Sequence, residues 1–437
     1  MGDAPREQTP EERGDRRVLP PPGIRAGILL LSVALLLSVI VHAKSFYVPH
    51  AEGDELVYLS LAREMNWNLS HYTTRDDPDV SRFPYSIYRA PLFHHPPLFA
   101  LVLKAGGLFG RPVLAGLLFQ NLAMFLLLLV AWRVLRFFQI APDLHPLLYS
   151  ALVLCHFISF STTRLHHDAL AAIFLFCGIM LFMEALEMRS ACLAAASALL
   201  LVLALNTRYT TLAALPLLFG VQALHLFRLF HSGGAEGGQR PAAAVLADRR
   251  SWDIFLPVFL LVATVGLHHY YRVLWQYGTL LPGGFIQSDG AERSNYFLYR
   301  VSNRSRWQIA AYFLTLFPAV LLLFHPQLLR HLRRMLREGS WACVPLAAGP
   351  YLFAVTLIFS HRQLRYFAPA LPFAYLAAVL LVDRSRGLWR SLLLATVVLT
   401  LFLMGSTTFY STAVQPEIAE IIPSLFVLFP PLEPSYF

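Results

Sequence analysis

Asp54 and Glu55 form an acidic pair where a helical pattern begins, directly after the first long apolar segment. The helix dipole and the exposed amides of a helix start keep a carboxylate ionised. An ionised carboxylate can take a proton from an attacking hydroxyl group or hold a divalent cation. An acidic pair here is also a common N-terminal helix cap. The spacing therefore leaves three roles open for this pair: general base, metal ligand and cap.

A group of phosphate-capable side chains follows, made of Arg89, His94 and His95, the last two standing directly before Pro96 and Pro97. Arginine donates two hydrogen bonds at once to phosphate oxygens, and a protonated histidine donates one. Residues that touch lipid headgroups at a membrane surface have the same composition. Both interpretations fit this group.

Three short polar stretches later in the chain carry further charges between apolar segments. They are TTRLHHD with Asp168, NTRYT with Arg208, and HRQLRY with Arg362, Arg365 and Tyr366. Each stretch alone is typical of a solvated turn. Together with the first loop they place several cations near a carboxylate pair on one face, which indicates a site for a phosphate group held at a membrane surface.

The composition restricts the protein class. The 437 residues are 57% hydrophobic and 14% charged, against about a quarter charged in soluble domains, so we expect a polytopic membrane protein. The net charge of +9 comes from arginine clusters between apolar segments, which is the positive-inside pattern and excludes a nucleic-acid partner. Neither a metal-ligand spacing nor a disulfide framework connects the four cysteines, Cys155, Cys177, Cys192 and Cys343.

A spanning helix needs about 20 apolar residues, and this length predicts eleven transmembrane helices in an all-α fold. A disordered cytoplasmic tail is expected at 1–23, the membrane domain at 24–411 and an extracytoplasmic tail at 412–437. The predicted helices lie at 24–43, 112–132, 145–162, 169–187, 190–206, 210–229, 253–271, 308–325, 342–360, 367–382 and 391–411.

The segment 44–111 forms a long first extracytoplasmic loop in this topology. DELVYLSLAREM has helical periodicity and predicts a helix lying on the membrane surface. HPPLFALVLKAGGLFG is apolar but shorter than a span and begins with two prolines, as an interfacial helix would. All the polar stretches described above then lie on the extracytoplasmic side.

The motifs GDELVYLSLAREM, HHPPLF, TRLHHDAL, NTRYTTLAALP and LRYFAPALP occur in this order over residues 24 to 382. This order resembles the GT-C glycosyltransferases of the dolichyl-phosphate-mannose-protein mannosyltransferase and aminoarabinose transferase type (glycosyltransferase families 39 and 83). The resemblance implies a GT-C fold and an enzyme that uses a polyprenyl- or dolichyl-phosphate-linked sugar as donor. Transfer would occur on the extracytoplasmic face, with inversion at the anomeric carbon. The acceptor, which could be a lipid, a glycan or a protein, is not implied.

Carried over by motif, the resemblance implies that Asp54 is the general base and that Glu55 is its acidic neighbour. His95 falls where aminoarabinose-type relatives have a lysine that contacts the donor phosphate. A histidine at this position titrates near neutral pH, unlike lysine. Asp168 matches an acidic residue at the start of the fourth helix.

The resemblance also covers two cationic positions near the extracytoplasmic ends of later helices. Arg208 falls where many relatives have a lysine after threonine. Arg365 and Tyr366 match an Arg-Tyr pair before a helix with spaced prolines. A divalent cation, if one is used, would be held by Asp54 and Glu55.

Two other function classes remain as alternatives. A non-catalytic relative would bind a lipid-linked sugar or act as a scaffold. A secondary transporter would also have many helices and charges, but transporters usually show repeated halves and broken helices at mid-membrane, and here no repeat is seen and the charges lie at helix ends. The arginine-rich composition favours a bacterial inner membrane, and two N-x-S sequons, at Asn68 and Asn303, keep the endoplasmic reticulum membrane as the alternative.

Overall fold

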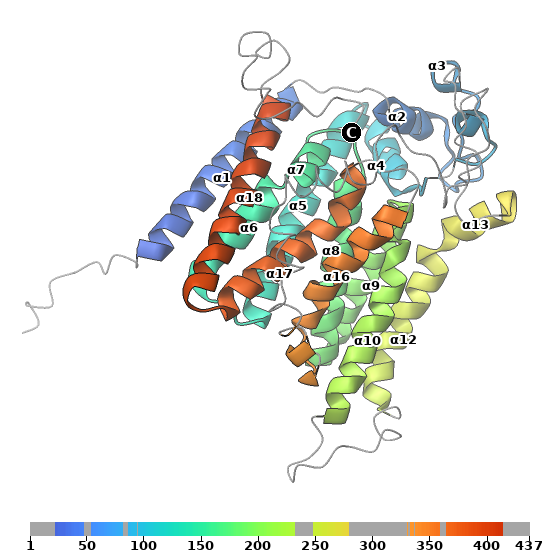
Figure 1. The fold of residues 1–437 in the computed structure, drawn as a ribbon. Helices are drawn as coiled ribbons and strands as arrows, with labels where there is room; N and C mark the ends of the chain where they lie inside the picture. The colour runs from blue at the N-terminus through green and yellow to red at the C-terminus, as the bar shows by residue number, and fades with distance from the viewer. Residues whose placement is uncertain are drawn as a thin grey trace, which may run out of the picture.

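The computed structural model describes residues 22–47, 54–81, 86–93, 95–231, 248–278, 330, 333–335, 337–358 and 364–413. Within these ranges the chain is helical and contains no β-strand. The tail 1–21, the predicted helix 308–325 and the C-terminal segment 414–437 lie outside the described residues. The expectation of an all-helical membrane protein agrees with this architecture (Figure 1).

Five helical segments of the described chain are long and apolar enough to cross a membrane: Pro112–Phe137, Asp168–Met188, Tyr209–His231, Tyr366–Arg384 and Gly387–Met404. A sixth is added if the bent pair Arg249–Gly266 and His268–Tyr277 counts as one span. Shorter apolar helices cover three more predicted positions, at Gly27–Ile40, Ala191–Leu205 and Cys343–Thr356. Eleven spans therefore stay a prediction.

The elements of the first half begin with α1 (Pro22–Tyr47), which precedes the first loop. Within that loop lie α2 (Asp54–Glu64), α3 (Pro78–Ser81), η2 (Ser86–Arg89) and α4 (Leu98–Gly107). The chain continues through α5 (Pro112–Phe137), η3 (Pro142–Leu144), α6 (His145–Leu154), α7 (His156–Thr162), α8 (Asp168–Met188) and α9 (Ala191–Leu205). Both helices predicted within the first loop are present, as α2 and α4.

The second half starts with η4 (Tyr209–Ala213), α10 (Ala214–His231) and α12 (Arg249–Leu261). A π-helical turn, η5 (Val262–Gly266), then leads into α13 (His268–Tyr277) with a bend of 43°. The remaining elements are α16 (Cys343–Ile358), η8 (Leu364–Ala370), α17 (Leu371–Arg384) and α18 (Gly387–Ala413). The predicted helix 253–271 is thus longer than expected, and its last part leaves the axis of α12.

The predicted helix 145–162 is divided at Cys155, whose backbone is not helical (φ −58°, ψ 110°). A break inside an apolar segment leaves carbonyl groups without their helical partners. Ser159 compensates for one of them, because its hydroxyl donates to the carbonyl of Val153 at 2.6 Å. The polar serine in this apolar segment therefore makes the break tolerable.

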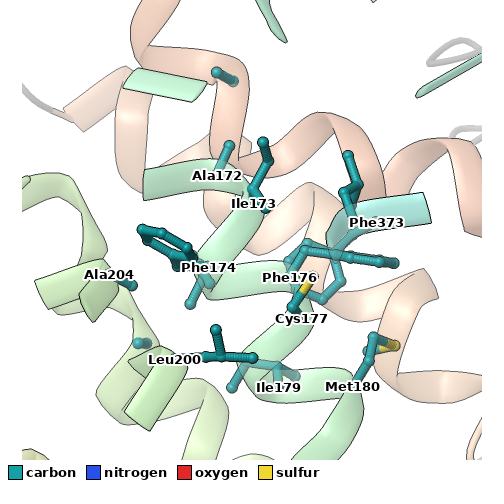
Figure 2. Close-up of a cluster of buried hydrophobic side chains, with 14 of the residues drawn as sticks. Ala172, Ile173, Phe174, Phe176, Cys177, Ile179, Met180, Leu200, Ala204 and Phe373 are labelled. Carbon is teal, nitrogen blue, oxygen red and sulfur yellow. The ribbon is translucent and has the colours of Figure 1, made fainter. Parts of the chain in front are cut away.

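Helix α8 is the centre of the bundle, and its residues from Asp168 to Leu186 are all buried. It packs against α5, α9, α10, α17 and η8. Figure 2 shows side chains of α8 between Leu200 and Ala204 of α9 and Phe373 of α17, and the rings of Phe176 and Phe373 meet edge to face at 5.1 Å. Small residues allow α9 to approach closely, since the Ser197 hydroxyl donates to the carbonyl of Gly178 at 2.8 Å.

The first loop lies at one end of the bundle. Figure 1 shows α2, α4 and α13 at this end, while α10 ends and α12 begins at the opposite end. A backbone hydrogen bond of 2.8 Å from Leu98 to the carbonyl of Asn206 fixes α4 to the end of α9. The polar stretches that are far apart in the sequence are thereby brought to one end of the molecule.

Candidate functional site

The acidic pair stands where α2 meets the turn between α7 and α8. Glu55 is fully buried, and its Oε1 accepts a hydrogen bond of 3.2 Å from the backbone N–H of Leu165. The Nε2 of His166 lies 3.9 Å from the same oxygen. Asp54 is the first residue of α2, and its side chain lies outside the described atoms. Glu55 therefore ties α2, which begins at Asp54, to the bundle.

Arg208 is the cationic centre of the site and is 1% exposed. Its Nη1 forms an ion pair with Oδ1 of Asp168, the first residue of α8. The guanidinium lies 4.2 Å from the ring centre of Tyr366 and 5.7 Å from that of Tyr209. Three predicted site residues from separate stretches, Asp168, Arg208 and Tyr366, are thus in direct contact.

The charge of Arg208 is stabilised by this environment. Burial is the largest single influence and acts to lower the pKa of the guanidinium. The electrostatic contributions of Asp168 and the neighbouring tyrosines Tyr366, Tyr209 and Tyr58 together outweigh burial and raise that pKa above its usual value. Arg208 therefore carries a positive charge at every physiological pH.

A hydrogen-bonded chain runs from Arg208 to His95 through His167 and Tyr58. Nη1 of Arg208 lies 3.1 Å from Nε2 of His167, and the Tyr58 hydroxyl lies 3.1 Å from the same nitrogen and 3.0 Å from Nδ1 of His95. Arginine can only donate, so Nε2 of His167 must accept and carries no proton. The Tyr58 hydroxyl shares the single lone pair of this nitrogen with Arg208, as a second donor, and accepts from the Nδ1–H of His95.

The exposure of this chain changes from one end to the other. Arg208, His167 and Tyr58 are buried, whereas His95 is half-buried. The imidazole of His95 stacks on Phe93 at 5.5 Å and meets Tyr209 edge to face at 5.6 Å. His95 is therefore the accessible end of this series of hydrogen bonds, and the charged group, Arg208, is the buried end.

The other predicted residues have different positions. Nη1 of Arg89, in η2, donates to the carbonyl of Ser81 at 3.2 Å, inside the first loop. Arg365 belongs to η8, but its side chain lies outside the described atoms. His94 and Arg362 lie outside the described residues altogether.

Tyr58 was not among the residues predicted for the site, although it is part of it. His167 and Tyr209 were expected only as members of the polar stretches TTRLHHD and NTRYT. Tyr58 lies one helical turn after Asp54 in α2, and residues at this spacing share a face of the helix. His167 directly precedes Asp168, and Tyr209 directly follows Arg208. The spacing of one helical turn between Asp54 and Tyr58 is the sequence signal that could have predicted Tyr58 as a site residue.

The fit of a divalent cation was tested on the carboxylates. The described residues contain no group of three or more His, Cys, Asp and Glu side chains that could hold a metal ion. Oε1 of Glu55 already accepts the N–H of Leu165, so Glu55 faces the bundle as a structural acceptor. We therefore derive no catalytic step through a metal ion.

The sequence matches no protein-family model and no curated protein.

Proposed function

We propose that the protein is a membrane glycosyltransferase that moves a sugar from a polyprenyl- or dolichyl-phosphate-linked donor to an acceptor hydroxyl group. The observation that carries the proposal is the chain from buried Arg208 to half-buried His95, beside the helix that begins with Asp54. An enzyme that cleaves a sugar–phosphate bond at a membrane surface needs a base that takes the proton of the acceptor hydroxyl. It also needs a hydrogen-bond donor that stabilises the leaving phosphate. This arrangement offers candidates for both.

In the proposed reaction, the acceptor oxygen attacks the anomeric carbon from the face opposite the phosphate. Asp54 takes the hydroxyl proton as the new C–O bond forms. The bond between the anomeric carbon and the phosphate oxygen breaks at the same time, and polyprenyl phosphate leaves with both bonding electrons. The configuration at the anomeric carbon is thereby inverted.

His95 is the proposed contact of the leaving phosphate, because it is the accessible end of the hydrogen-bonded chain. In its protonated form it would donate its Nε2–H to a phosphate oxygen while its Nδ1–H is given to Tyr58. Arg208 is too deeply buried to act as the first contact and is paired with Asp168. Its proposed role is to position His95 through His167 and Tyr58. Arg362 and Arg365 remain predicted phosphate contacts, and Arg89 remains a predicted contact at the edge of the loop.

The wider assignment follows from the same proposal. A GT-C fold of eleven spans, with α2 and α4 lying at the extracytoplasmic membrane surface, would place the donor lipid in the bilayer and its phosphate at the site. The apolar spans support an integral membrane location, for which a bacterial inner membrane is proposed. A lipid, a glycan or a protein would be the acceptor.

The test compares wild type with Asp54→Asn in liposomes that contain a panel of labelled polyprenyl-phosphate sugars, with cell extract as the source of acceptors. The readout is release of polyprenyl phosphate. Asp76→Asn is the matched control, because Asp76 is an exposed carboxylate of the same loop. General-base catalysis contributes about 10²–10⁴-fold, so Asp54→Asn should lose at least about a hundredfold in rate while the control keeps wild-type turnover.

Each other outcome has a defined meaning. Equal turnover in wild type and Asp54→Asn would remove Asp54 as the base. A donor that binds the wild-type protein tightly but is never consumed, with every acceptor tried, would replace the enzyme with the non-catalytic, lipid-linked-sugar-binding protein. Both variants must unfold at the wild-type temperature for the comparison to count.

A further inference from the structure

A groove of about 360 Å³ lies between α13 and the first loop. Ser70 lines it on the loop side. His268, Tyr271, Arg272, Trp275 and Gln276 line it on the α13 side. Figure 1 shows that α13 projects beyond α12 toward the end of the bundle that carries α2 and α3.

The walls of the groove are fixed to each other and to the bundle. Nη2 of Arg272 donates to the carbonyl of Leu69 at 2.7 Å. The Tyr277 hydroxyl donates to the carbonyl of Leu92 at 2.6 Å and accepts from the N–H of Leu92 at 3.1 Å. Tyr270, on the opposite face of α13, donates to the carbonyl of Leu205 in α9 at 2.9 Å. The groove is therefore held by contacts from both sides.

Two aromatic side chains one helical turn apart are exposed on the α13 wall. Trp275 is 92% exposed and Tyr271 is 49% exposed. Aromatic rings present a flat apolar face and, in Trp and Tyr, a polar edge that forms hydrogen bonds. Such a face matches the C–H face of a sugar ring, which is flat and apolar while its hydroxyl groups point outward.

The polar side chains of the groove suit the hydroxyl groups of a sugar. Gln276 offers both donors and an acceptor, His268 offers one of each when neutral, and Arg272 has five N–H donors, of which one is given to Leu69. None of the residues that line the groove in the described chain is acidic. The lining thus combines aromatic faces with hydrogen-bonding groups, as sugar-binding sites require.

The groove also adjoins the proposed catalytic chain. Leu92, which Tyr277 holds in place, directly precedes Phe93, and the ring of Phe93 stacks on His95 at 5.5 Å. On the buried face of α13, His269 meets the ring of Tyr72 edge to face at 5.7 Å. A molecule in the groove would lie beside the loop that carries His95.

We infer that the groove between α13 and the first loop binds a carbohydrate, with its ring stacked on Trp275. Its role as the subsite for the acceptor glycan rests on the proposed transferase function. The binding itself rests on the groove alone.

The experiment measures binding of a panel of neutral and acidic disaccharides to the detergent-solubilised full chain by titration calorimetry. Wild type is compared with Trp275→Ala and Gln276→Ala, whose side chains are exposed. Phe109→Ala is the control, since Phe109 is an 83% exposed aromatic residue after α4. We expect at least one sugar to bind wild type and Phe109→Ala equally, with about tenfold weaker binding to Trp275→Ala. No binding to wild type, or equal binding to Trp275→Ala, would overturn the inference.

A second measurement separates a sugar from a lipid surface as the occupant. Wild type and Trp275→Phe are placed in nanodiscs with brominated phospholipids. The difference in fluorescence between the two proteins is the emission of Trp275, and the bromine atoms quench this emission if the indole lies among the lipids. Little quenching is expected for an indole in an aqueous groove. Strong quenching would show that Trp275 lies in the bilayer and would overturn the inference.

The transferase proposal and the proposal that the groove binds a carbohydrate can fail independently. Sugar binding to the groove needs no donor, so it is measured apart from the release of polyprenyl phosphate. Sugar binding that depends on Trp275 in a protein without donor turnover would keep the groove and remove its acceptor role. Donor turnover without Trp275-dependent sugar binding would keep the transferase proposal and remove the groove as a sugar site.

Discussion

Removing the charge of Arg208 should destabilise the protein strongly, because both members of its ion pair with Asp168 are 1% exposed. Truncating one member of a buried pair leaves the other as an uncompensated charge, at a loss of about 3–5 kcal/mol in the free energy of unfolding. The hydrogen bond to His167 and the contact with Tyr366 are lost as well. Arg208→Met and Asp168→Leu should each therefore unfold about 3–5 kcal/mol more easily than wild type.

The double variant Arg208→Met/Asp168→Leu should be much more stable than the sum of the single losses implies. Replacing both charges by apolar side chains of similar size is often close to neutral. The bond to His167 and the Tyr366 contact are not regained, so the double variant should lie about 1–2 kcal/mol below wild type. The coupling energy in the cycle should then be about 3 kcal/mol or more.

Unfolding in mixed micelles, followed by titration with sodium dodecyl sulfate, measures these four free energies. The pair Asp143 and Arg390 is the matched control, with an Nη2–Oδ2 distance of 3.2 Å and side chains 38% and 43% exposed. Exposed pairs couple by about 0–1 kcal/mol. Additive single losses at Arg208 and Asp168, within about 0.5 kcal/mol, would refute the claim that the two charges stabilise each other in a buried site.

The same proteins, with Arg208→Lys added, separate stability from function. The double variant should fold but release polyprenyl phosphate much more slowly than wild type, since no charge then holds His167 and His95. Arg208→Lys should lie between them, because lysine keeps the charge but lacks the planar donor fork. Wild-type turnover in the folded double variant would remove Arg208 as a positioning residue.

Three further predictions concern other parts of the molecule. Tyr58→Phe removes the hydroxyl that joins His167 and His95, so donor turnover should fall by about tenfold and the free energy of unfolding by about 1 kcal/mol. Unchanged turnover would show that the hydrogen-bonded chain is not used. Burial acts to raise the pKa of the Asp77 carboxyl, but its hydrogen bonds with Ser60, Arg63 and the N–H of Asp79 together outweigh burial and lower that pKa. The stabilising effect of Asp77 should therefore be complete above about pH 4 and disappear as the pH falls through the lower folded-state value. Unfolding of wild type and Asp77→Asn should therefore converge at low pH, and a difference that grows on acidification would contradict this sign. A Cβ atom added at Gly178 would lie 2.8 Å from Leu201 Cγ, whereas at Gly220 none of the described atoms lies within 4 Å of such an atom. Gly178→Val should therefore lose about 1–3 kcal/mol in the free energy of unfolding, and Gly220→Val should not. Equal stability of the two variants would show that α8 and α9 can separate without loss.

Hydropathy and helical periodicity were sufficient to predict most of the described helices. The apolar segments that became α5, α8, α10 and α18, and the two helices of the first loop, are visible in the sequence because these patterns depend on neighbouring residues. The division at Cys155 and the bend before α13 were not predicted. Both depend on how a segment packs, and apolar segments have the same composition with or without a break.

The candidate site was predicted only in part. The sequence supplied its residue types, since charges are rare in apolar segments and each of Asp54, Asp168 and Arg208 stands out there. Because successive loops alternate between the two sides of a membrane, the sequence also suggested that these residues lie on the same side. It gave no indication that Arg208 pairs with Asp168 or that Tyr58 joins two histidines.

The sequence by itself determined that this protein is a bundle of apolar helices with polar loops, because hydrophobicity acts locally along the chain. Only the tertiary structure decided which polar side chains meet, since Tyr58 and His167 are separated by 109 positions and Tyr277 and Leu92 by 185. Such contacts depend on how α2, α8, α9 and α13 pack together. The chain from Arg208 to His95 and the groove beside it are therefore products of packing, and no local pattern encodes them.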